Sequence, residues 1–217
     1  EEATRLVPTL WAEGLRGGIL YFDGQFDDSR LAIALLRTFL DQGGSALNWA
    51  PVTGIIHREG RVAGVEARDE ETGETFRIAS RVVVNAGGVF ADTIRRLDQA
   101  DARQLIRASR GSHLVLDRSV LPGEASVMIP KTDDGRILFL IPWLDRVILG
   151  TTDTEVVGLP GEPHPSAEEV AYLLNHAGRY LTRTPEPGEV RSVFAGLRPL
   201  INQSGVQSTA KLSREHA

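Results

Sequence analysis

The sequence contains no cysteine among its 217 residues. Disulfide bonds and cysteine-ligated metal sites are therefore excluded, and nothing in the composition indicates an oxidising compartment. No stretch approaches the roughly 18 consecutive apolar residues that a membrane-spanning helix requires. The chain opens on Glu1 and Glu2, whose charge is opposite to that of a signal peptide's basic region, so we expect a cytoplasmic protein.

The chain also lacks an excess of positive charge. Its 24 Lys and Arg are outnumbered by 29 Asp and Glu, which gives a net charge of −5. Because nucleic-acid binding depends on clustered Lys and Arg, we expect no nucleic-acid partner. The basic residues stand singly, a distribution that suits local recognition of one small anion.

A third absence is the G-x-G-x-x-G fingerprint of dinucleotide-binding domains, since no G-x-G occurs anywhere. Residues 82–88, VVVNAGG, nevertheless predict a buried strand, a glycine turn and a helix near residues 90–97. Glycines let the backbone approach a cofactor closely. A plain strand-to-helix turn without a ligand fits the motif equally well. If a flavin binds, the segment that grips its pyrophosphate lies before Glu1.

The pattern of apolar residues predicts an α+β protein. Short helices are expected over residues 1–13 and 30–42, and a β-meander followed by the buried strand is typical of the second half of a Rossmann-like domain. After about residue 100 the chain changes to extended segments with one helix over residues 166–181, capped by Ser166 and Glu169, which predicts a mixed β-sheet domain. The expected strands are residues 19–22, 46–49, 53–58, 61–68, 74–79, 82–84, 105–108, 113–116, 125–129, 137–143, 147–149 and 190–194.

Residues 137–154, ILFLIPWLDRVILGTTDT, predict a β-hairpin whose second strand ends at Gly150. Two hydroxyls and a carboxylate follow that glycine: Thr151, Thr152 and Asp153. Such side chains can bind a substrate hydroxyl, but they more often cap a turn, and we favour the structural role. Lys131 begins a polar loop that reads as a turn and could also lie beside a site.

His113 is a candidate general base, because histidine titrates near neutral pH and can accept a hydroxyl proton during alcohol oxidation. The neighbouring Gly111 allows close approach. A lone histidine is more often structural, so both roles stay open. No pair of histidines has metal-ligand spacing, so we expect no metal site, and the remaining four are expected at the surface: His57, His164, His176 and His216.

Arg198 is a candidate anion-binding residue. It stands before a proline, which favours an extended backbone, and its guanidinium suits bidentate capture of a phosphate or carboxylate. A solvated arginine is the alternative. Arg214 lies in a second strand-like segment, and two arginines on adjoining strands could clamp one dianion. Val52 lies in a strand connection, where its backbone could pair with an adenine edge or serve only as a link.

Five motifs in order, VVVNAGG, RGSH, FLIPW, ILGTTD and GLRPL, resemble the FAD-dependent glycerol-3-phosphate dehydrogenases of the D-amino-acid-oxidase-like superfamily. The similarity extends to YFDGQFDDSRL near the start and KLSREH at the end. The resemblance implies oxidation of sn-glycerol 3-phosphate to dihydroxyacetone phosphate by hydride transfer to FAD. Electrons would then pass to a quinone, and the full-length protein would be peripheral on the cytoplasmic membrane.

By position, the resemblance implies that His113 is the active-site histidine near the substrate hydroxyl. Arg198 and Arg214 would bind the substrate phosphate. It also implies three cofactor contacts, the adenine-facing backbone of Val52 and two residues that line FAD: Ala86 and Gly87.

The family's N-terminal G-x-G-x-x-G element and its C-terminal regions are missing, and the chain has no initial Met, so we expect an internal fragment. Isolated, it should bind FAD poorly and be inactive. We expect residues 1–26 as a lead-in to the substrate (cap) domain and 27–100 as part of a Rossmann-like FAD-binding domain. Residues 101–200 would form the substrate-binding sheet, and 201–217 a return strand.

Three other functions remain open. A glycerol-3-phosphate oxidase would share these motifs and pass electrons to oxygen. An amino-acid oxidase of the same superfamily would use the paired arginines to bind a carboxylate. A non-catalytic binding domain would keep only the fold, although His113 and Arg198 in their family context speak against it.

Overall fold

The computed structural model describes residues 1–130 and 132–202. Lys131 and Arg214 lie outside the described residues. Helices and antiparallel sheets together make up the described chain, so the predicted α+β class is confirmed at this level. No helix in these two ranges is long and apolar enough to cross a membrane.

The chain forms two compact units from interleaved stretches. Unit 1 comprises Glu1–Gly18, Gly88–Asp92 and the described residues from Arg103 onward. Unit 2 comprises Ile19–Gly87 and Thr93–Ala102. Each unit has its own sheet.

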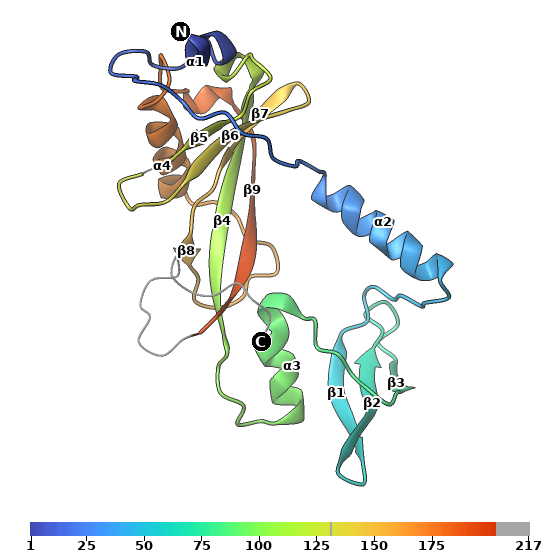
Figure 1. Cartoon of the computed structure of the whole chain (residues 1–217). Helices are drawn as coiled ribbons and strands as arrows, with labels where there is room; N and C mark the ends of the chain where they lie inside the picture. The colour runs from blue at the N-terminus through green and yellow to red at the C-terminus, as the bar shows by residue number, and fades with distance from the viewer. Residues whose placement is uncertain (131, 203–217) are drawn as a thin grey trace. The chain divides into compact units, whose positions relative to one another are not determined.

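The sheet of unit 1 is antiparallel, with the strand order β5-β6-β7-β4-β8, and β9 also pairs with β4. Figure 1 shows β4 and β9 side by side as the two long strands. The hairpin expected within residues 137–154 is confirmed as β6 and β7. The strands are β4 (Ile106–Asp117), β5 (Val127–Ile129), β6 (Leu138–Trp143), β7 (Arg146–Gly150), β8 (Thr154–Glu155) and β9 (Val190–Ile201).

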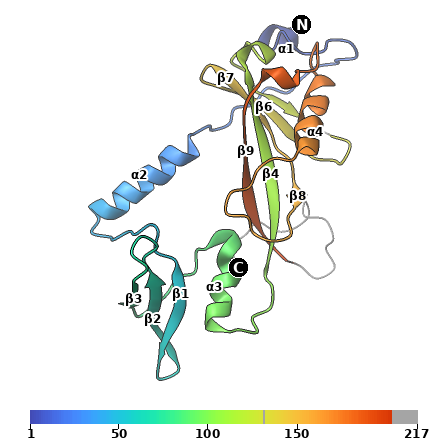
Figure 2. The same ribbon diagram turned by 180° about the vertical axis from the view of Figure 1, so that it is seen from behind.

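One face of this sheet packs on helix α4 (Ala167–Gly178), which lies beside the strands in Figure 2. Successive side chains of a strand point to opposite faces. On β4, Leu114 and Leu116 therefore enter the apolar core, whereas His113 points away from it. The fully buried members of the core are Leu114, Leu116, Leu121, Ile129, Leu138, Leu140, Val147, Leu149, Leu173 and Ala177.

The capping box predicted for α4 is confirmed. The Ser166 hydroxyl accepts a hydrogen bond from the Glu169 backbone amide, and the Glu169 side chain accepts one from the Ser166 amide. The first helix, α1 (Glu2–Leu6), is shorter than the expected residues 1–13. Pro8 explains the difference, because the residue before a proline is disfavoured in the helical conformation.

Unit 2 contains helix α2 (Asp28–Asp41) and the antiparallel meander β1-β2-β3. Asp27 caps α2 by accepting the Arg30 amide at 2.9 Å. The meander occurs where the sequence predicts it, as β1 (Val52–Arg58), β2 (Arg61–Arg68) and β3 (Thr75–Ala79). No residue of α2 is buried, and its exposed apolar side chains include Leu31, Ile33, Leu35, Leu36 and Phe39.

Several expected strands are absent from the described residues. The expectation of a buried strand at residues 82–84 is wrong. No described strand pairs with these residues, and both Val82 and Val84 are exposed. Residues 19–22 and 46–49 form no strand either. An apolar run becomes a strand only when a neighbour completes its hydrogen bonds, which the run itself does not reveal.

Other segments differ in extent. The two strands expected at residues 105–108 and 113–116 are one strand, β4. They are joined because β9 pairs with β4 without interruption at Gly111. The predicted helix near residues 90–97 is confirmed as α3 (Ala91–Asp98). Short 3-10 turns complete the fold: η1 (Gly88–Phe90), η2 (Arg118–Val120) and η3 (Pro187–Glu189).

Candidate functional site

His113 lies on β4 between two neighbouring strands. It is paired with Gly150 of β7 on one side and with Phe194 of β9 on the other. Its imidazole stacks on the Phe194 ring, with ring centroids 4.7 Å apart and planes inclined by 8°. A Cβ atom on Gly150 would overlap the imidazole, so this position has to be glycine for the ring to occupy its place.

Arg198 lies four residues after Phe194 on β9 and therefore on the same face of the sheet. Its Nη1 donates to the Thr152 carbonyl and its Nη2 to the Thr151 hydroxyl, both at 3.0 Å. The side chain remains 25% exposed. The guanidinium is thus held in one orientation and is still accessible to a ligand.

Gly111 makes room for Arg198. A Cβ atom at Gly111 would collide with the guanidinium, which shows that the arginine reaches back over this part of β4. His113 follows two residues later on the same face, about 6–7 Å along the strand. The structure therefore brings together an imidazole and a guanidinium at a spacing that a small molecule with one anionic end can span.

Asp153 lies beside the guanidinium. One of its oxygens is 3.7 Å from Arg198 Nη1 and also accepts a hydrogen bond from the Ser109 hydroxyl. Ser109 is opposite Arg198 in the β4–β9 register. A carboxylate at this distance orients the arginine without forming a close bidentate pair with it.

The turn of residues 151–154 is anchored from beneath by Glu169. The Thr152 and Thr154 hydroxyls donate to Glu169 Oε1 at 2.9 and 2.8 Å. The other oxygen accepts the Ser166 amide at 2.9 Å and pairs with Arg110 at 2.8 Å. Thr152 Oγ1 also accepts the Ser112 amide of β4 at 2.9 Å.

Glu169 is 6% exposed and ionised at neutral pH. Its burial by itself would raise the pKa, but the Ser166 amide, the two threonine hydroxyls and Arg110 together lower the pKa below its ordinary value. Arg110, the first residue of the RGSH motif, therefore forms an ion pair with this carboxylate on the core side of the sheet.

The predicted cofactor residues belong to unit 2. Val52 begins β1, pairs with Ala67 and is half-buried. Ala86 is exposed, and the Gly87 amide donates to the Asn85 side chain at 3.1 Å. Their roles stay predictions, as do those of His113 and Arg198.

The polar loop after Lys131 is attached to α4. Asp133 forms a two-pronged ion pair with Arg179, and Asp134 accepts the Tyr172 hydroxyl at 2.8 Å. His176 was expected at the surface, but it is 4% exposed. Its ring packs on the ring of Tyr172, with centroids 4.1 Å apart. The two residues are four apart on α4 and share one face of the helix, the face that contacts the loop through Asp134.

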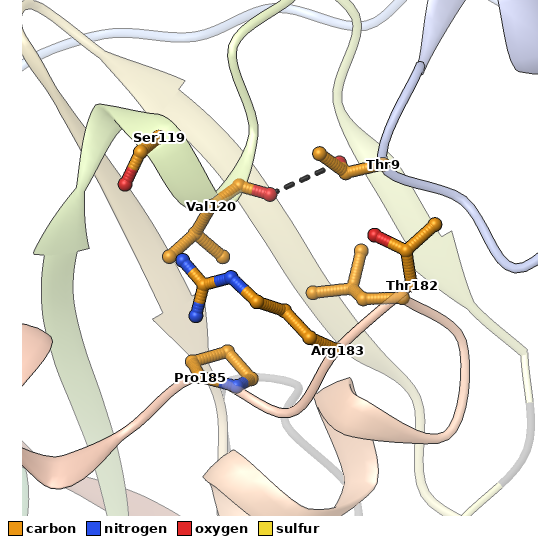
Figure 3. A pocket seen from close by; sticks show the side chains of 7 residues that line it. Thr9, Ser119, Val120, Thr182, Arg183 and Pro185 are labelled. Carbon is orange, nitrogen blue, oxygen red and sulfur yellow. Dashed lines mark hydrogen bonds between the residues drawn. The ribbon is translucent and has the colours of Figure 1, made fainter.

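A small cavity of about 20 Å³ lies elsewhere in unit 1 and is shown in Figure 3. Thr9 donates to the Val120 carbonyl at its edge. This volume suits about one water molecule, which is too small for a metabolite. Among the described residues, no three His, Asp or Glu side chains gather closely enough to hold a metal ion.

Comparison with known proteins identifies the family. The family model described as FAD dependent oxidoreductase, DAO, matches residues 1–212. The chain belongs to this family. This chain is 38% identical to the mitochondrial glycerol-3-phosphate dehydrogenase SDP6 of Arabidopsis thaliana, over all of this chain and 35% of that one. It is 33% identical to the human mitochondrial glycerol-3-phosphate dehydrogenase, over 96% of this chain and 30% of the relative.

A solved structure agrees with these relatives. The glycerol-3-phosphate dehydrogenase of Bacillus halodurans, complexed with FAD, superimposes with a TM-score of 0.87 at 34% identity. The match covers 93% of this chain and 41% of that one. FAD is therefore the cofactor of the family. This chain spans about a third of the length of the curated relatives it matches.

Sequence reasoning missed the second role of Glu169 and the partner of Thr152. The capping-box spacing revealed only the local bonds of Glu169 to the helix start. Its bonds to Thr152 and Thr154 join segments 15 or more residues apart, and no local pattern predicts them. The structural role favoured for residues 151–153 fits these contacts.

We predict that Gly111→Ala displaces the Arg198 guanidinium from Thr151, because the added methyl overlaps it. The guanidinium is the end of a flexible side chain and can move aside, so the loss of stability should be small, about 1 kcal/mol from the broken hydrogen bonds. Gly196→Ala is the matched control, since Gly196 pairs with Gly111 and a Cβ there meets nothing within 4 Å. Crystal structures and urea unfolding of both variants measure the effect. An Arg198 guanidinium that keeps both of its hydrogen bonds in Gly111→Ala would contradict the crowding.

A second prediction concerns acid stability. Because the pKa of Glu169 is lowered on folding, its contribution is complete above the ordinary value of 4.5 and is lost as pH falls through the folded value. The unfolding free energies of wild type and Glu169→Gln should therefore differ at pH 7, and the difference should shrink progressively as pH falls below the ordinary value of 4.5. Glu162→Gln, in an exposed loop, should follow wild type throughout. A gap that stays constant down to pH 3 would show that the carboxylate charge is unimportant.

Proposed function

We propose that this chain is the substrate-facing part of an FAD-dependent glycerol-3-phosphate dehydrogenase. The reaction would oxidise sn-glycerol 3-phosphate to dihydroxyacetone phosphate. FAD would supply the acceptor for the hydride from C2, and a base on the protein would take the hydroxyl proton. Glycerol 3-phosphate is proposed as the substrate because the proteins to which the chain is similar are glycerol-3-phosphate dehydrogenases.

The single observation that carries the proposal is the shared face of β4 and β9. Arg198 presents a fixed, partly exposed guanidinium over Gly111, and His113 follows two residues away. A guanidinium of this kind recognises a phosphate, and binding at that remote group orients the reacting carbon. The imidazole is then placed to take the hydroxyl proton. Arg214, which lies outside the described residues, would supply a second cation.

FAD, when bound, supplies the acceptor for the hydride. Gly88 has a positive φ of 55° and open space around it, and Ala86 is exposed, so this backbone is accessible to a cofactor. Ala86 and Gly87 would line FAD, and Val52 would face its adenine. These residues fit one side of the cofactor, whereas the sequence has no G-x-G cradle for its pyrophosphate.

The proposal extends to the domains and to the electron acceptor. Residues 27–100 would form part of the Rossmann-like FAD domain, residues 1–26 and 101–200 the substrate domain, and 201–217 a return strand. The complete protein would lie peripherally on the cytoplasmic membrane and pass its electrons to a quinone. Hydrogen peroxide formed in place of reduced quinone would identify a glycerol-3-phosphate oxidase instead.

In the flavin-loaded holoenzyme, Arg198→Ala should raise KM for glycerol 3-phosphate by about 10–100-fold, the equivalent of one lost charged hydrogen-bonding group. Arg191→Ala is the control, because Arg191 lies on the same strand and pairs with Asp117 at the sheet edge. His113→Gln should lower kcat by about 100-fold or more, whereas His164→Gln, in an exposed loop, should not. Steady-state kinetics measure all four variants.

An unchanged KM in Arg198→Ala would exclude the phosphate role. Failure of phosphate esters to compete, together with turnover of an amino acid, would indicate that the arginine binds a carboxylate. Loss of substrate binding in Arg198→Ala would count against a non-catalytic domain.

The isolated 217-residue chain should bind FAD poorly and be inactive. The exposed apolar side chains of α2 support this expectation, because a contiguous exposed apolar patch is typical of a surface that packs against another protein segment. Flavin absorbance after reconstitution and gel filtration measures the occupancy. A stoichiometric yellow protein that oxidises glycerol 3-phosphate would refute it.

A further inference from the structure

Glu169 is a buried charged group that the proposed reaction does not use. Four donors converge on its two oxygens: the Thr152 and Thr154 hydroxyls, the Ser166 amide and Arg110. An ionised carboxylate offers about four lone-pair sites, so the four donors match its full capacity. A glutamine amide in its place would face at least two of these donors with an NH2 group.

The turn of residues 151–154 is fixed through this carboxylate. Thr152 is bonded to Glu169 of α4 and, through the same hydroxyl oxygen, to the Ser112 amide of β4. Thr154 adds a second bond to Glu169. The turn is therefore tied both to the helix and to the strand that carries His113.

The same turn supplies both acceptors of Arg198. The Thr152 carbonyl receives Nη1, and the Thr151 hydroxyl receives Nη2. These acceptors are within one residue of the Thr152 hydroxyl. A shift of the turn would move the guanidinium with it, and a displacement of about 1 Å can cost about 100-fold in rate.

We propose that Glu169 is a positioning residue for anion recognition: it acts through the 151–154 turn to set the orientation of the Arg198 guanidinium. The inference rests on the proposed function, because it assigns Arg198 the phosphate of the substrate. Glu169 itself touches no substrate. Its effect should therefore fall on phosphate binding more than on the chemical step.

The test compares Glu169→Gln with wild type in the flavin-loaded holoenzyme. We expect KM for glycerol 3-phosphate and the inhibition constant of inorganic phosphate to rise together by at least about tenfold, with a smaller change in kcat. Glu189→Gln is the matched control, because Glu189 also closes a capping box and pairs with an arginine, Arg183, at 2.6 Å. Its two constants should stay within about twofold of wild type.

A second pair of variants covers the case in which Glu169→Gln fails to fold. Thr152→Val keeps the shape but removes the hydroxyl, and it should weaken phosphate inhibition. Thr152→Ser restores the hydroxyl and should recover most of the affinity. Weaker phosphate inhibition in both variants, or in neither variant, would overturn the inference.

The double variant Glu169→Gln/Arg198→Ala separates the possible failures. If Glu169 acts through Arg198, adding Glu169→Gln to Arg198→Ala should change phosphate affinity no further. If Arg198→Ala weakens phosphate binding and Glu169→Gln does not, the positioning role is wrong and the proposed function stands. If Arg198→Ala leaves phosphate binding unchanged, the proposed function fails and this inference fails with it.

Discussion

The candidate site depends on the antiparallel register between β4 and β9. That register sets Ser109 opposite Arg198, Gly111 opposite Gly196 and His113 opposite Phe194. A slip of one residue would turn every one of these side chains to the other face of the sheet. The apolar core opposes such a slip, because it would also move Leu114 and Leu116 out of their buried positions. Core packing on one face therefore determines the placement of polar groups on the other.

Local patterns were sufficient for several elements. Alternating apolar residues predicted the β6–β7 hairpin, turn residues predicted the meander, and the Ser166–Glu169 spacing predicted the start of α4. Each of these signals lies within one element or one turn. His113 was correctly expected in a strand and Arg198 in an extended segment. Whether the two share a face could not be predicted, because that depends on pairing between residues about 80 positions apart.

Two expectations depended on the same missing information, namely which distant segment of the chain lies beside the residues concerned. Residues 82–84 have the composition of a buried strand, yet no described strand pairs with them. Gly111 was interpreted as room for close approach, and the structure fills that room with the Arg198 guanidinium. In both cases the residue type was informative about space or hydrophobicity. Which group lies beside these residues depends on the packing of a segment that is distant in the sequence.

The burial of Glu169 explains how α4 can matter to a site on the opposite face of the sheet. Removing a carboxylate from water is unfavourable, and an apolar side chain of similar size often stabilises a core better. A buried charge does, however, impose strict geometry, because each donor must meet an oxygen. Here the donors come from the start of α4, from β4 and from the 151–154 turn. The same turn also accepts a hydrogen bond from Arg198. The helix cap and the Arg198 guanidinium are thus two ends of one hydrogen-bond network, and the position of one constrains the other.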